Sequence, residues 1–225
     1  MMDKEEIKRR EWLKQASFKE KMKYYSSYYT IPLIIALFFA AVGISFVRTF
    51  IMHKESALYV TLVNFAALKE DSAAIADPFA KEHINTRRQE IVIDNSSYIS
   101  ADESEVNVLK YGYEDEQRLM TFVFTGLIDI MISGDDVIER YAEKQWFDDL
   151  STFMDADMLA EFEKEGRILK YGGVPIAVRT DDSALLNDNY YYNGRKTDGL
   201  YAAFTANSEH RELAVEFLQY LLDGK

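Results

Sequence analysis

Cysteine is absent from the 225-residue chain, and its absence removes several kinds of chemistry at once. A chain without thiols forms no disulfide bond and has no thiolate metal site, cysteine nucleophile or lipid-modified cysteine anchor. Histidine is nearly as scarce, since only His53, His83 and His210 occur, far apart in the sequence. They show no metal-ligand spacing, so we expect no metal site.

Glycine-rich phosphate-binding motifs are also missing. The chain has ten glycines, but no Gly-x-Gly-x-x-Gly follows a strand-like run and no phosphate loop ends in Gly-Lys-Ser/Thr. The Gly-x-Ser-x-Gly motif of many hydrolases is absent too. We therefore expect no cofactor and no enzymatic activity, and a cell-envelope enzyme is the least favoured alternative.

One long run lacks charge altogether. Ile31 to Val47 reads IPLIIALFFAAVGISFV, and the preceding residues extend it to membrane-compatible length. About 20 residues, at ~1.5 Å each, cross a hydrocarbon layer of ~30 Å. The tyrosines at 24, 25, 28 and 29 are typical of the aromatic belt at a membrane interface. The alternative, a core helix of a soluble domain, would show a polar face, and this run has none.

The charges on the two sides of this run differ. Residues 1–23 contain eight lysines and arginines, whereas Arg48 and Lys54 are the basic residues close to its other end. The positive-inside bias places the N-terminus in the cytoplasm. A cleaved signal peptide is disfavoured because the basic and apolar regions are long and no small-x-small site follows cleanly. We predict a single-pass cell-membrane protein with a basic cytoplasmic segment over 1–27, a transmembrane signal-anchor helix over 28–52 and an extracellular domain over 55–225.

The expected extracellular domain is strongly acidic. Residues 55–225 carry 16 basic and 33 acidic side chains, a net charge of −17, against +5 for residues 1–54. A nucleic-acid-binding domain needs a basic footprint, so this balance argues against nucleic acid as a partner.

Strand-like and helix-like segments alternate along the domain. Apolar, β-branched runs predict strands over 58–64, 89–95, 127–133, within 167–179 and over 199–205. Amphipathic patterns predict helices over 71–84, 114–126, 135–146 and from about 207 to the C-terminus. The polar, irregular segment 97–113 is expected to be loop, and 180–198 shows no sustained period. This alternation predicts an α/β domain with a mostly parallel, doubly wound sheet, preceded by the transmembrane helix.

Acid pairs such as Asp135-Asp136 raise the question of a metal or catalytic site. None of the pairs has the loop spacing of a calcium-binding hand. Residues Ser133 to Asp136 match the Ser-x-x-Asp spacing of a helix capping box, which accounts for the acids without catalysis. Asp129, inside an apolar run, needs a hydrogen-bonding partner if it is buried.

Aromatic residues supply the candidate ligand-binding groups. Tyr190, Tyr191 and Tyr192 could stack on a sugar or hold a partner, and Trp146 could join them. The alternative is a tyrosine-rich loop that packs on its own domain.

The order of five segments resembles a known family. These segments are LYVTLVN, GLIDIMIS, WFDDLSTFM, YGGVPIAV and GLYAAFTANSEHRELAVEFLQYLL. Together they resemble the extracellular solute-binding proteins of ABC transporters, which have the type II periplasmic-binding-protein fold. In that family a second lobe usually follows the segment that matches YGGVPIAV, whereas here about 20 residues, Arg179 to Asp198, precede the late strand. The resemblance therefore implies a single-lobe member anchored by a helix in the bacterial cell envelope.

We weigh three functions, of which the first two follow from this resemblance. The first is a membrane-anchored, solute-binding-like module that binds a ligand or a protein at the cell surface, beside an ABC transporter or a sensor. The second is a genuine receptor for a sugar or peptide, and the third is the envelope enzyme. The expected partners are the lipid bilayer, a membrane transporter or sensor protein, and a small solute such as a sugar or peptide.

Overall fold

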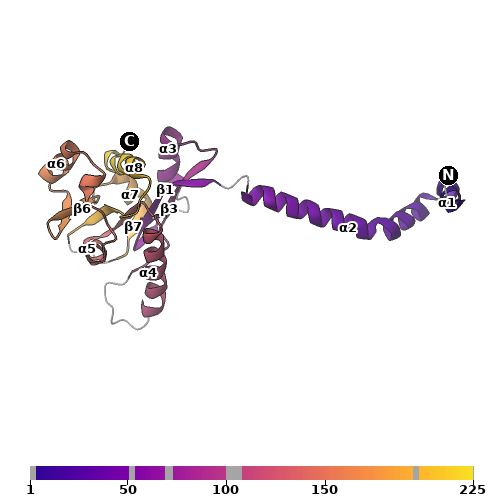
Figure 1. The fold of residues 1–225 in the computed structure, drawn as a ribbon, viewed down its shortest axis with the longest axis horizontal. Helices are drawn as coiled ribbons and strands as arrows, with labels where there is room; N and C mark the ends of the chain where they lie inside the picture. Colours follow the sequence, from indigo (N-terminus) through magenta and orange to yellow (C-terminus); the bar gives the residue numbers. More distant parts are fainter. Residues whose placement is uncertain (1–3, 51–53, 69–72, 100–107, 195–197, 225) are drawn as a thin grey trace. The chain divides into compact units, whose positions relative to one another are not determined.

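The computed structural model describes residues 4–50, 54–68, 73–99, 108–194 and 198–224. The chain forms two compact units, Met1–His53 and Lys54–Lys225. Figure 1 shows both units along the chain. The second unit contains the strands, so we call it the α/β domain.

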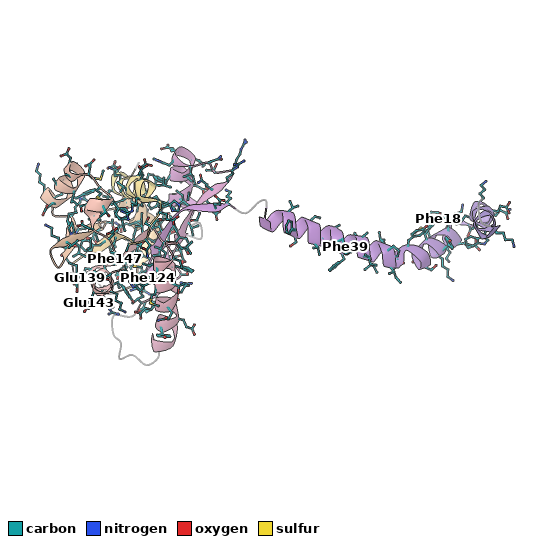
Figure 2. All side chains as sticks on the ribbon, viewed as in Figure 1. Phe18, Phe39, Phe124, Glu139, Glu143 and Phe147 are labelled. Atoms are coloured by element: carbon teal, nitrogen blue, oxygen red, sulfur yellow. The ribbon has the colours of Figure 1, made fainter. Side chains whose placement is uncertain are left out.

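The first unit consists of helices α1 (Lys4–Gln15) and α2 (Phe18–Phe50). A capping box separates them, because Ser17 Oγ lies 3.4 Å from the Glu20 N–H while Glu20 Oε2 accepts from the Ser17 N–H at 2.8 Å. The side chains of α2 are exposed along its apolar part, as Phe39 illustrates in Figure 2. Residues Tyr29–Val47 are long and apolar enough to cross a bilayer, and a signal sequence near an N-terminus meets the same criteria. The end of the predicted span, residues 51–52, lies outside the described residues.

The α/β domain alternates strands and helices for most of its length. Its strands are β1 (Glu55–Leu62), β2 (Phe65–Ala67), β3 (Gln89–Asp94), β4 (Ile130–Gly134), β5 (Ile168–Tyr171), β6 (Val174–Arg179), β7 (Tyr190–Tyr192) and β8 (Leu200–Phe204). Its helices are α3 (Ala73–His83), α4 (Val108–Phe124), α5 (Asp135–Glu143), the short 3-10 helix η1 (Leu150–Thr152), α6 (Ala156–Lys164), α7 (Ala184–Asn189) and α8 (Arg211–Asp223).

The described residues form a six-stranded sheet in the order β3-β1-β4-β8-β6-β5. Strands β3, β1 and β4 are parallel, β8 runs against β4, and β6 runs against β8. Because β6 therefore points the same way as β4, four strands share one direction and β8 and β5 oppose them. The prediction of a mixed α/β domain with a mostly parallel sheet is confirmed, and β2 and β7 form a separate antiparallel ribbon.

Helices pack on both faces of the sheet, each over its own apolar cluster. Helices α3, α7 and α8 cover one face, where Phe79, Leu186 and Phe217 join the alternate residues of β1 and β4. Helices α4 and α5 cover the other face, with Leu119 and Tyr141 among the buried residues. This arrangement gives every central strand two buried faces, which is why the strand segments read as continuous apolar runs.

Parts of the irregular segments prove to be regular. Residues 108–113 belong to α4, so the prediction that all of 97–113 is loop is wrong for that part; residues 100–107 lie outside the described residues. Within 180–198, α7 and β7 form although the segment shows no long period. Helix α7 has six residues and β7 has three, so neither is long enough to show a period in the sequence.

Candidate functional site

The four strands of common direction end at one edge of the sheet, β3 among them because Asp94 pairs with Thr61. Strands β1, β4 and β6 end there, and β8 begins there, because Gly134 pairs with Leu200 and Arg179 pairs with Tyr201. Ligands of open α/β sheets bind outside the carboxyl ends of the strands. We call this region the strand-end edge, and it is the candidate site.

The ribbon of β2 and β7 lies directly beyond the end of β1. The chain turns into β2 at Asn64, whose φ of 66° is in the left-handed region that asparagine tolerates. The backbone N–H of Asn193 donates to the Asn64 carbonyl at 2.7 Å, which fixes β7 to this turn. One face of the ribbon, with Phe65, Tyr190 and Tyr192, packs against the domain.

Tyr192 reaches the start of helix α5. Its hydroxyl accepts a hydrogen bond from the Gly134 N–H at 3.1 Å, and Gly134 is the N-cap residue of α5. An exposed backbone N–H at a helix start is a ready position for an anionic or polar ligand group. Here the protein's own tyrosine occupies that position, and burial raises the pKa of Tyr192 above its ordinary value.

Asn64 is held on its other side by the segment after β3. Its side-chain oxygen accepts from the Ile99 N–H at 2.7 Å, and its amide donates to the Ile99 carbonyl at 2.9 Å. Both polar ends of this buried side chain are therefore satisfied within the protein. The pairing ties the turn after β1 to residues 97–99.

Arg179, at the end of β6, forms a compact polar cluster with Asp198 and Tyr201. One guanidinium nitrogen of Arg179 lies 2.6 Å from Asp198 Oδ2 and 2.7 Å from the Tyr201 hydroxyl. The Tyr201 hydroxyl donates to the same carboxylate oxygen at 2.6 Å. The hydrogen bonds to Tyr201 and Asp198 raise the pKa of Arg179 above its ordinary value. The hydrogen bonds from Tyr201 and Arg179 lower the pKa of the Asp198 carboxyl.

The acids at the start of α5 are held by the protein backbone. Asp135 Oδ2 accepts from the Asp198 N–H at 3.1 Å, and Asp136 Oδ1 accepts from the Val137 N–H at 2.9 Å. The predicted capping role of Ser133 is wrong. Strand β4 continues to Gly134, so Ser133 is still in the strand, and its hydroxyl donates to the Val63 carbonyl at 3.1 Å.

Asp129 has the partners that its burial requires, at the opposite end of β4. The carboxylate accepts from the Tyr59 N–H at 2.8 Å and from the Ser208 hydroxyl at 2.7 Å. Nδ1 of His210 lies 3.2 Å away. These contacts join β1 and the start of α8 to β4, so this acid has a structural role. Helix α8 itself begins after His210, its N-cap residue.

The structure does not bring the four predicted ligand-binding residues together. Trp146 is only 1% exposed and stacks on Tyr141, with ring centroids 4.0 Å apart, on the sheet face covered by α4 and α5. Tyr190 is buried on the other face, and Tyr192 contacts Phe65 and Gly134. Tyr191 is 60% exposed. Ligand binding by these residues stays a prediction, and Tyr191 is the one whose ring is largely free to meet a partner.

Sequence reasoning did not single out Asn64, Gly134, Arg179 or Tyr201. Each of them lies at or next to a strand end, so the rule that ligands bind at carboxyl strand ends would have selected this region. Among the residues that the structure describes, no group of three histidine, aspartate or glutamate side chains could hold a metal ion.

Comparisons with known proteins give one structural likeness. No family model matches the chain, and no curated protein matches it. A solved structure, the ABC substrate-binding protein Lmo0181 from Listeria monocytogenes in complex with cycloalternan, is similar at a TM-score of 0.33 and 14% sequence identity. The match covers 57% of this chain and 29% of that protein. The likeness is therefore distant and concerns the fold of part of the chain.

Proposed function

We propose that the protein is a membrane-anchored module that binds a protein partner at the outer surface of the cell membrane. The helix with the apolar span Tyr29–Val47 supplies the anchor, and the α/β domain supplies the binding surface. The partner is a membrane protein such as a transporter or sensor. The proposal places the basic segment before the span in the cytoplasm.

The ribbon at the strand-end edge carries this proposal. Its inner face fills the place of a small ligand, because Tyr192 satisfies the Gly134 N–H and the ribbon is bonded to Asn64. Its outer face is exposed and apolar: Ala66 pairs with Tyr191 across the ribbon, and Leu68, two residues further along the same strand direction, is 58% exposed. An exposed apolar face next to satisfied polar groups suits a protein surface better than a small solute.

Site-specific photocrosslinking in intact membranes tests the proposal. A photoreactive amino acid at Tyr191 is expected to give a discrete crosslinked product with one membrane protein. The same amino acid at Tyr171, an exposed tyrosine of the edge strand β5, is the matched control and should give no such product. Equal or absent crosslinking at the two positions would contradict a binding role for the ribbon.

A receptor for a sugar or peptide is the second candidate, favoured by the same exposed Tyr191 ring, since aromatic faces stack on such ligands. Thermal unfolding of the full chain in detergent separates the two functions. The protein-binding function predicts an unchanged melting temperature with panels of oligosaccharides and short peptides. A concentration-dependent rise that Tyr191→Ala abolishes would instead establish the receptor function.

A further inference from the structure

Helix α2 begins well before its apolar span. The span starts at Tyr29 and the helix starts at Phe18. At ~1.5 Å per residue the helix therefore continues for about 16 Å outside the hydrocarbon layer. The headgroup layer on each side of a bilayer is only about 5–8 Å thick. Lys23 and Lys21 lie roughly 9 and 12 Å from Tyr29 along the helix axis, so their flexible side chains reach the depth of the lipid phosphates.

Helix α1 turns back toward the same level. After the turn at Ala16 and Ser17, the Trp12 ring of α1 contacts the Tyr24 ring of α2, with centroids 5.6 Å apart. Trp12 is still 47% exposed, and Phe18 at the turn is more so (Figure 2). Tryptophan and tyrosine favour the membrane interface, where an apolar ring meets a polar environment. The contact therefore sets Trp12 at the depth of Tyr24, in the interfacial layer.

The exposed charges of this helix pair are mostly positive, with Glu11 and Glu20 as the exposed acids among the side chains that the structure describes. Lys8, Lys14, Lys19 and Lys23 are exposed, and Lys21 is half-buried. Glu20 is engaged by the capping box, and the hydrogen bond from the Ser17 backbone lowers the pKa of its carboxyl. Among the side chains that the structure describes in this unit, none of these lysines forms an ion pair.

We infer that the α1–α2 helix pair binds the anionic headgroups of phospholipids, with Trp12 in the interface and Lys21 and Lys23 at the phosphates. This inference rests on the proposed membrane anchoring and adds a lipid preference to it. Charge complementarity and continuity with the apolar span identify the occupant as the bilayer surface. Polybasic segments next to a membrane span prefer anionic leaflets, and the preference weakens as salt screens the charges.

Tryptophan fluorescence tests the inference, because the chain has two tryptophans and Trp146→Phe leaves Trp12 as the single reporter. The full-length variant is reconstituted in nanodiscs that contain equal amounts of phosphatidylglycerol and phosphatidylcholine. Two samples are compared: in one the phosphatidylglycerol carries brominated acyl chains, and in the other the phosphatidylcholine does. Brominated phosphatidylglycerol should quench Trp12 about threefold or more better than brominated phosphatidylcholine at low salt. In 1 M salt, where the screening length is only ~3 Å, the two brominated lipids should quench Trp12 equally.

Substitution of Lys21 and Lys23 by glutamine should remove the preference, and substitution by arginine should keep it. Inorganic phosphate at matched ionic strength should leave it unchanged, which separates lipid headgroups from free phosphate. Equal quenching by the two lipids, or no quenching by either, would overturn the inference. Resistance of the protein to alkaline extraction from membranes reports the anchor separately, so failure of the lipid preference and failure of the anchor are distinguishable.

Discussion

The hydroxyl of Tyr192 accepts a hydrogen bond from the Gly134 N–H, which closes the start of helix α5 with a side chain from a strand 58 residues away. This contact ties the β2–β7 ribbon to the end of β4 in the central sheet, in addition to the bond from the Asn193 N–H to the Asn64 carbonyl. It also removes the backbone donor that a small ligand would use at this edge. The ribbon therefore covers the strand-end edge at the start of α5.

Tyr192→Phe should lower the free energy of unfolding by about 1 kcal/mol, because it leaves the Gly134 N–H without its partner. Urea denaturation followed by circular dichroism measures the loss. Tyr191→Phe is the matched control, since Tyr191 is exposed, and it should change stability by less than about 0.5 kcal/mol. Equal losses in the two variants would show that the Tyr192 contact has no special role.

Phe217→Ala should cost about 3–5 kcal/mol, the usual range for truncating a fully buried aromatic residue. Phe217 is 0% exposed and packs edge-on against Phe79 of α3, with centroids 5.1 Å apart. Gln219→Ala, on the exposed side of α8, is the control. A loss below about 1 kcal/mol for Phe217→Ala would mean that the terminal helix is peripheral to the core.

Asp129→Asn should destabilise the α/β domain by about 2–3 kcal/mol, because a buried carboxylate with several donors is replaced by a neutral group. The substitution weakens the hydrogen bonds from Tyr59 and Ser208. The exposed Asp157→Asn is the control and should change the unfolding midpoint little. If both variants unfold at the wild-type urea concentration, the buried acid contributes nothing to stability.

Alkaline pH should destabilise the domain through Tyr59. Burial, and next the nearby Asp94, raise the pKa of Tyr59 to about 12, from about 10 in an unfolded chain. The folded state thus holds this proton more tightly. Its contribution to stability is complete below about pH 10 and disappears as the pH rises toward 12.

Tyr59→Phe should therefore make the decline of unfolding free energy between pH 10 and 12 less steep, whereas the exposed Tyr171→Phe should leave the slope unchanged. Urea titrations at a series of alkaline pH values give both slopes. An unchanged slope in Tyr59→Phe would rule out this residue as a cause of the decline.

The regular part of the fold follows from the sequence because its central strands are buried on both faces. Runs such as LYVTLVN and LIDIMIS are mostly apolar, and they become β1 and β4 with ends that shift by up to three residues. The short strands β2 and β7 could not be predicted in this way. Three residues are too few for a period, and each strand exists because it pairs with the other.

The site could be predicted less well, because it depends on single-residue boundaries and on which face a side chain takes. Strand β4 runs one residue beyond Ser133, since Gly134 pairs with Leu200, and this shift turns an expected cap into a buried strand residue. The sequence alone does not distinguish Trp146 from Tyr191 as an aromatic binding residue. In the structure Trp146 is buried in the apolar cluster beneath α4 and α5, whereas Tyr191 is exposed.

The absence of cysteine allows the most direct test of the central claim, a surface domain held by a membrane anchor. Gln15→Cys in α1 and Ala160→Cys in α6 each introduce one exposed thiol into the chain. Intact cells are treated with a membrane-impermeant maleimide before and after permeabilisation. The account predicts that Ala160→Cys is labelled in intact cells and that Gln15→Cys is labelled only after permeabilisation. Labelling of Gln15→Cys in intact cells, or of Ala160→Cys only after permeabilisation, would contradict it.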